Sequence, residues 1–215
     1  DFNNNGAVAF KGKTQRFASL PSLAPEGFEI EIVGDETTAF DNYYVRFEKI
    51  NPTDSTGIWR ETVQQGIKDT INTSTMPLVL VREADDTFTL RIQDWGKRTA
   101  GDEVSNPAPS FVGRSVRDLF LFRNRLGFIA GDAVIMSQSG DLFNHWPVTV
   151  AQVLDDGPID LTAADSATDL HAATPFAGKL ILWAEKKQLA IISDAILTPR
   201  SVAIETLSNY AASNA

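Results

Sequence analysis

The sequence predicts a mainly β fold, in which an antiparallel β-rich N-terminal domain is followed by β-propeller-like blades that form a partial propeller. Two observations predict this class. Apolar residues come in short runs, and several alternate with polar residues at the period of two that is typical of strands. Gly, Pro, Asn and Asp separate these runs and favour turns. One stretch, with Trp59, Val63 and Ile67, has helical spacing and is compatible with either a short helix or a strand and loop.

Three strands are predicted in the first 50 residues of the chain. Glycine and proline punctuate residues 1–27, where one short strand is expected at Ala7–Phe10. The segment Phe28–Ile32 alternates apolar and acidic residues, which indicates a strand with one wet face. After a turn over Thr37–Asn42, the segment Tyr43–Ile50 predicts the next strand.

Apolar runs on either side of turn residues predict two hairpins. The runs 77–82 and 87–92 enclose the polar turn Glu83–Asp86. Further on, Leu126–Ala130 is joined to Val134–Met136 by Gly131–Asp132, where glycine supplies the positive φ of a tight turn. The run DLFLF at residues 118–122 is apolar on both faces, so we expect that strand to be covered on both sides.

The polar segment Gly96–Ser110 carries two prolines and two glycines without periodicity and predicts a domain boundary. We therefore expect a β-rich, platform-like domain over residues 1–105. A propeller-like region with two blade-like repeats is expected over residues 106–215.

The two repeats have little sequence identity but contain the same elements in the same order. Each has an apolar strand, a turn and a second strand; they begin 54 residues apart, at Phe122 and Phe176, and end 56 residues apart, at Ser137 and Ser193. Short strands repeating at about this spacing are typical of propeller blades. An ordinary antiparallel sandwich is the alternative.

Composition narrows the possible functions. The 215 residues are 43% hydrophobic and 22% charged, with a formal net charge of −9 that disfavours non-specific binding to DNA or anionic membranes. The absence of cysteine excludes thiolate chemistry within these residues, and no apolar run reaches the ~20 residues of a membrane span. The chain begins without methionine or signal-peptide character, so we interpret it as an internal fragment.

Four arginines cluster in this acidic chain: Arg114, Arg117, Arg123 and Arg125. They could cross a subunit interface or form salt bridges with nearby carboxylates such as Asp118. Contact with DNA phosphates is the second interpretation.

No catalytic, cofactor-binding or metal-ligating residue is predicted. The loop Gly6–Thr14 has five residues between its glycines, one more than a phosphate-binding loop requires. Aspartates are dense after residue 150 and are expected to cap turns and strands. The alternative is a glycan hydrolase that uses two of these carboxylates: Asp141, Asp155, Asp156, Asp160 and Asp165. A glycan-binding propeller would expose its tryptophans, whereas Trp59, Trp95, Trp146 and Trp183 are expected to anchor cores.

Several motifs resemble the T7-like phage tail tubular protein B family, also called the tail nozzle protein family. The central matches are SNPAPSFVG at 105–113, FRNRLGF at 122–128 and FNHWP at 143–147. STMP followed by LVLVR at 74–82, the stretch 33–45, and Trp59 also match, with Leu78 where the family usually has histidine. Downstream, DDGPID at 155–160 and LTPRSV at 197–202 resemble family elements.

The resemblance implies a structural virion protein and no enzyme. In that family six copies form the tapering end of a short tail, so the chain is expected to form a homohexameric ring in its full-length protein. The implied partners are a tail adaptor protein and tail fibres, with transient passage of double-stranded DNA during ejection. The implied location is the virion tail, after synthesis in the host cytoplasm, and no cofactor is implied.

Overall fold

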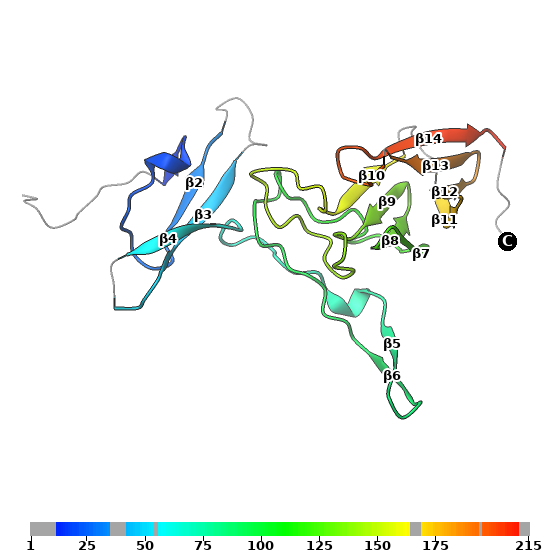
Figure 1. The fold of residues 1–215 in the computed structure, drawn as a ribbon, viewed down its shortest axis with the longest axis horizontal. Coiled ribbons are helices and arrows are strands. Elements are labelled where there is room, and N and C mark those ends of the chain that lie inside the picture. The colour runs from blue at the N-terminus through cyan, green and yellow to red at the C-terminus, as the bar shows by residue number, and fades with distance from the viewer. Residues whose placement is uncertain (1–11, 35–41, 54–55, 164–168, 194, 211–215) are drawn as a thin grey trace, which may run out of the picture. The chain divides into compact units, whose positions relative to one another are not determined.

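A computed structural model of the chain describes residues 12–34, 42–53, 56–163, 169–193 and 195–210 (Figure 1). The strand expected at Ala7–Phe10 and most of the turn expected at Thr37–Asn42 lie outside these ranges. Most regular elements are short antiparallel strands, as the sequence predicts. Within the described residues, no helix is long and apolar enough to cross a membrane.

The chain divides into two compact units, each assembled from separate stretches. The first contains residues 1–68, 98–107 and 148–152, and the second contains residues 69–97, 108–147 and 153–215. The segment predicted to be a linker therefore contributes to both units, and Ala100 and Asn106 within it are buried. A division into independently folding domains at residues 105 and 106 stays a prediction.

The first unit is built on one four-stranded sheet in the order β1-β2-β3-β4, with β1 parallel to β2 and the other pairs antiparallel. Its elements are β1 (Lys13–Thr14), η1 (Phe17–Ser19), β2 (Glu29–Ile32), β3 (Tyr43–Lys49) and β4 (Gly57–Thr62). Ile30, Ile32 and Val45 form its apolar core, which confirms the alternation predicted for 28–32. Trp59 lies in strand β4, so the strand-and-loop alternative holds there.

The second unit contains two four-stranded antiparallel sheets with the same connectivity. The first has the order β10-β9-β8-β7 and the second β11-β12-β13-β14. The strands of the first are β7 (Asp118–Phe122), β8 (Arg125–Ala130), β9 (Ala133–Met136) and β10 (Ile159–Thr162). Those of the second are β11 (Leu170–Phe176), β12 (Lys179–Ala184), β13 (Gln188–Ile192) and β14 (Ala203–Ser208).

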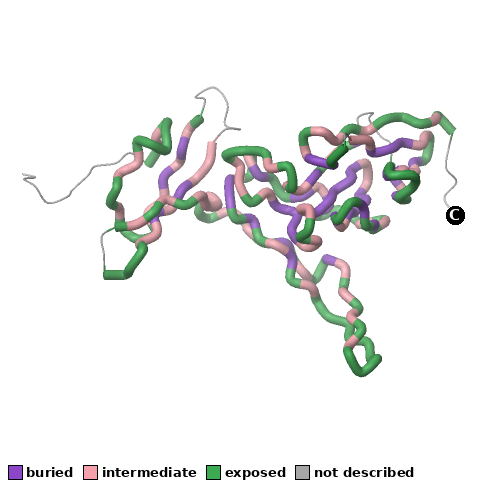
Figure 2. Tube along the Cα trace, in the orientation of Figure 1, coloured by how far each residue is buried: buried purple, intermediate pink, exposed green. Residues whose placement is uncertain are grey.

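The two sheets share one apolar core. Strands β7 to β10 contribute Phe120, Ile129 and Met136, and the second sheet contributes Leu180 and Ile191. The other face of the first sheet packs on a second cluster, the outer apolar layer, which includes Trp95, Phe111 and Trp146. The buried residues of these two layers are among the purple segments of this unit in Figure 2.

The hairpins predicted in this unit are confirmed. Gly131, with φ of 64°, lies in the turn between β8 and β9, and β12 and β13 pair as an antiparallel hairpin within the second repeat. The elements η3 (Thr73–Thr75), β5 (Val79–Arg82) and β6 (Phe88–Arg91) complete the unit, and β5 and β6 form the two-stranded hairpin predicted around Glu83–Asp86.

The prediction that strand 118–122 is covered on both faces is wrong. Phe120 and Phe122 are buried, but Leu119 and Leu121 are 56% and 63% exposed. The physical reason is position: β7 is the edge strand of its sheet. The outer apolar layer, which includes Phe111 and Phe128, leaves the two leucines uncovered.

Candidate functional site

The four clustered arginines lie on or beside the β7–β8 hairpin, whose two strands are joined by a tight turn. Arg123 and Asn124 form this two-residue turn with φ of 46° and 61°, and positive values at both positions suit the right-handed twist of the flanking strands. Within the hairpin, Phe120 lies opposite Gly127. A Cβ on Gly127 would lie 2.1 Å from the Phe120 ring, so only glycine fits beneath it.

Arg125 is buried and 1% exposed, and its guanidinium donates hydrogen bonds to backbone carbonyls from three separate stretches. Nη1 donates to the carbonyls of Ser137 at 2.7 Å and Gly157 at 2.6 Å. Longer bonds of 3.3 Å reach Asp156 from Nη1, and Asp155 and Leu197 from Nη2.

This geometry joins the sequence stretches that carry the family resemblance. The arginine belongs to FRNRLGF, and all its acceptors except Ser137 lie in DDGPID or at the start of LTPRSV. Burial lowers the pKa of Arg125, and the charge of Asp156 opposes that shift. The guanidinium thus acts as a structural cation that holds three loops in place.

The other three arginines make surface contacts. Arg114 pairs with Asp132 at 2.8 Å. Arg117 pairs with Asp169 at 2.9 Å, and its Nη1 lies 3.3 Å from Nδ1 of His171. Because β11 follows Asp169, the Arg117 pair connects the two sheets.

Arg123 connects the same two sheets at their turns. Its guanidinium donates to Oγ of Ser193 at 2.9 Å and to the carbonyl of Gly178 at 3.1 Å, and it lies 5.4 Å from the centre of the Phe122 ring. Asp118, the partner considered in the sequence, instead accepts the backbone N–H groups of Leu119 and Ala173. Whether any of these arginines also crosses a subunit interface stays a prediction.

Three of the aspartates considered for catalysis, Asp141, Asp156 and Asp160, accept local hydrogen bonds through their carboxylates. Asp141 accepts the N–H of Phe143 at 3.4 Å. Asp156 accepts Nε2 of Gln138 at 2.9 Å. Asp165 lies outside the described residues.

Asp160 is exposed on β10 and accepts the N–H of Ser110 at 2.8 Å. Asp155 contributes its carbonyl to Arg125. Among the residues that the structure describes, no three His, Cys, Asp or Glu side chains are grouped so as to hold a metal ion.

The tryptophans serve packing. Trp95 and Trp146 are buried in the outer apolar layer of the second unit. Trp59 and Trp183 are partly buried; their Nε1 atoms donate to the carbonyl of Pro21 at 2.8 Å and to Oγ1 of Thr174 at 3.1 Å, respectively.

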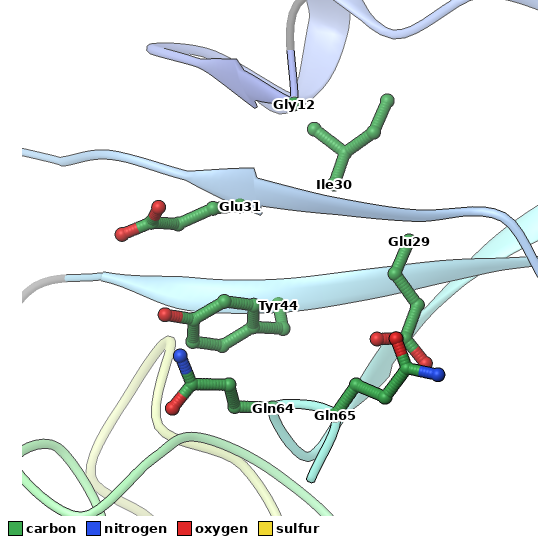
Figure 3. A pocket seen from close by; sticks show the side chains of 7 residues that line it. All are labelled: Gly12, Glu29, Ile30, Glu31, Tyr44, Gln64 and Gln65. Atoms are coloured by element: carbon green, nitrogen blue, oxygen red, sulfur yellow. The ribbon is translucent and has the colours of Figure 1, made fainter.

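Sequence reasoning missed a shallow pocket of about 260 Å³ in the first unit, shown in Figure 3. Its lining residues are Gly12, Glu29, Ile30, Glu31, Tyr44, Gln64 and Gln65. The alternation of Glu29 and Glu31 on the wet face of β2 is the signal that could have indicated it.

Each carboxylate of this pocket has its own cation. Glu31 pairs with Lys13 at 2.8 Å, and Glu29 pairs with Arg46 at 2.5 Å. Burial, followed by the charges of Glu31 and Asp102, raises the pKa of Tyr44 to about 12, so the phenol stays protonated. The polar side chains of the pocket can form hydrogen bonds with a ligand. Its two glutamates are each paired with a cation, so they do not form an acid–base pair.

Two comparisons with known proteins agree with the resemblance. The model of the bacteriophage nozzle protein family matches residues 1–215. The chain is also 36% identical over 197 residues to the tail tubular protein gp12 of Escherichia phage T7, an alignment that covers 91% of this chain and 24% of that relative. The chain thus spans about a quarter of the length of the relative. The chain belongs to the bacteriophage nozzle protein family.

Proposed function

We propose that the chain is part of a structural subunit of a short phage tail, a nozzle or tail-tube protein that forms part of the channel for DNA ejection. The observation that carries the proposal is the family match over the whole chain, together with a relative whose name is tail tubular protein. The subunit acts in the virion tail by its shape and contacts, and it is not an enzyme.

The proposed mechanism is mechanical. Two four-stranded sheets share one core, and Arg125 fastens the loops beside it, which favours a rigid wall element. We propose that six copies form a homohexameric ring, with an adaptor protein on one side and tail fibres attached nearby. Double-stranded DNA passes through the ring during ejection.

The two sheets also support the proposal that they are blades of a partial propeller. Both are four-stranded antiparallel meanders. Their first hairpins have two-residue turns with positive φ, at Arg123–Asn124 and at Ala177–Gly178. Four-stranded antiparallel sheets of this kind are the unit of β-propellers.

A phage that lacks the full-length gene tests the function. We expect it to produce DNA-filled heads with incomplete tails and no infectious particles, and a plasmid copy of the gene should restore both. Electron microscopy and plaque counts provide the measurement. Complete tails on the deletion particles, or an infectivity loss without a tail defect, would contradict a structural role.

A further inference from the structure

The β5–β6 hairpin presents an apolar face that nothing in the described part of the chain covers. Leu80 and Leu90 lie opposite each other in the register, and Phe88 follows on the same face because side chains alternate along a strand. Leu78 and Ile92 flank the two strands. These five residues are 52–63% exposed, and every residue of β6 is exposed, so the hairpin is largely green in Figure 2.

An exposed apolar ribbon of this kind is typical of an interaction surface. A two-stranded hairpin by itself is at best marginally stable in water. Five large side chains exposed to this extent leave about 500 Å² of apolar surface, at the upper end of the patches found on monomers. That is more than half of the roughly 800 Å² that one partner buries in a standard interface.

A complementary surface exists on the same chain, at edge strand β7. Its outward leucines, Leu119 and Leu121, are 56% and 63% exposed beside the apolar layer that covers β8. Exposed arginines flank them, Arg117 before the strand and Arg123 after it.

The charges of the two surfaces are complementary. The tip of the β5–β6 hairpin carries Glu83, Asp85 and Asp86, and of these Asp86 pairs with Arg82. Arg123 at the end of β7 hydrogen-bonds with neutral oxygens of Ser193 and Gly178, which leaves its positive charge available to an acidic tip.

We propose that the apolar face of the β5–β6 hairpin docks on the outer face of β7 in a second copy of this chain, with its acidic tip toward Arg123. The contact is head-to-tail, and repeated contacts of this kind close into a ring when the rotation between successive copies divides a full turn. The inference rests on the proposed function, because it identifies the hairpin as the arm that connects neighbouring subunits of that ring.

The test uses the full-length protein and mass photometry. The doubly substituted variant Leu80→Glu with Leu90→Glu should raise the dissociation constant between subunits by at least about 100-fold. The matched control is Thr89→Glu, on the opposite face of the same exposed strand, and it should leave the ring intact. Melting curves for each variant check that the subunit itself still folds.

The outcomes separate the two proposals. A wild-type protein that forms no ring would overturn the proposed function and this inference together. A ring retained by the double variant would overturn the inference alone, and so would an equal loss in the Thr89→Glu control, since the effect would then not depend on the face.

Thiol cross-linking tests the second surface without disrupting the fold. This part of the protein has no cysteine. In a full-length protein whose cysteines elsewhere are replaced by serine, Leu80→Cys and Leu121→Cys therefore place two defined thiols. A short bismaleimide should join neighbouring subunits of this variant into covalent ladders. The control pairs Leu80→Cys with Leu207→Cys, an exposed position on β14. No ladder from the Leu121 variant, or an equally strong ladder from the control, would overturn docking on β7.

Discussion

Arginine side chains of the same cluster have different roles because they differ in burial. Arg125 is almost fully buried among carbonyl oxygens, whereas the Arg114 side chain is 51% exposed and makes one ion pair. A buried charge without its hydrogen-bond partners is costly, whereas an exposed pair contributes little. The shared residue type therefore does not imply a shared function.

Replacing Arg125 by alanine should lower the free energy of unfolding by about 3–5 kcal/mol, because several buried carbonyls lose their donor and a large cavity forms. Arg114→Ala is the matched control and should change it by less than about 1 kcal/mol. Urea unfolding followed by circular dichroism gives both values. Similar small losses for the two variants would show that Arg125 is not the anchor.

We expect His145 to make the free energy of unfolding depend on pH. Its ring is 3% exposed and stacks on Phe128 at 5.2 Å, with Trp95 and Phe111 around it. Burial lowers the pKa of His145 to about 4 from 6.5. In the unfolded chain His145 is therefore protonated below about pH 6.5. In the folded chain it is protonated only near pH 4 and below.

As the pH falls from about 6.5 to about 4, this histidine should reduce the free energy of unfolding by roughly 3 kcal/mol. In His145→Phe that contribution disappears, although carboxylates still titrate in both proteins. The difference between the two unfolding curves, measured across this range, isolates the histidine. A difference that stays constant with pH would mean that the imidazole is not kept neutral by burial.

At the scale of the element, the β7–β8 hairpin depends on the Phe120–Gly127 pair. Gly127→Ala would drive a methyl group into a ring that is itself buried and has little room to move. We expect a loss of about 1–3 kcal/mol. Gly12→Ala serves as control, since a Cβ there meets nothing within 4 Å and its φ is not positive, so we expect a change of less than about 0.5 kcal/mol.

Combining Gly127→Ala with Phe120→Leu distinguishes steric overlap from a backbone effect. The smaller side chain should recover part of the loss caused by alanine, which a double-mutant cycle of unfolding free energies measures. Strictly additive losses would show that the ring does not clash with the new methyl group.

The elements themselves could be predicted from sequence because they depend on local patterns. The alternation at 28–32 and the turn at Gly131 act over a few residues, and the structure confirms both. The exposure of Leu119 and Leu121 could not be predicted, since it depends on which strand forms the sheet edge. The acceptors of Arg125 were equally inaccessible, because they are backbone carbonyls up to 72 residues away.

At the scale of the whole molecule, net charge bears on the proposed passage of DNA. The chain carries a net charge of −9, and phosphate is negative as well. Fewer contacts between cations and phosphates release fewer counterions, which removes the main source of non-specific affinity. If the residues that line the proposed channel share this acidity, DNA slides past them without being retained.

With such a lining, a full-length ring of the proposed kind should bind a short fluorescent duplex more weakly than the ~10⁻⁴–10⁻⁶ M range of ordinary non-specific binders. Fluorescence anisotropy at about 50 and about 200 mM salt provides the measurement. A protein that used the exposed Arg114, Arg117 and Arg123 to grip phosphates would bind tightly at the lower salt and lose affinity steeply at the higher. That result would favour DNA contact over the structural role of the cluster, whereas weak binding at both concentrations supports a wall that DNA passes without adhering.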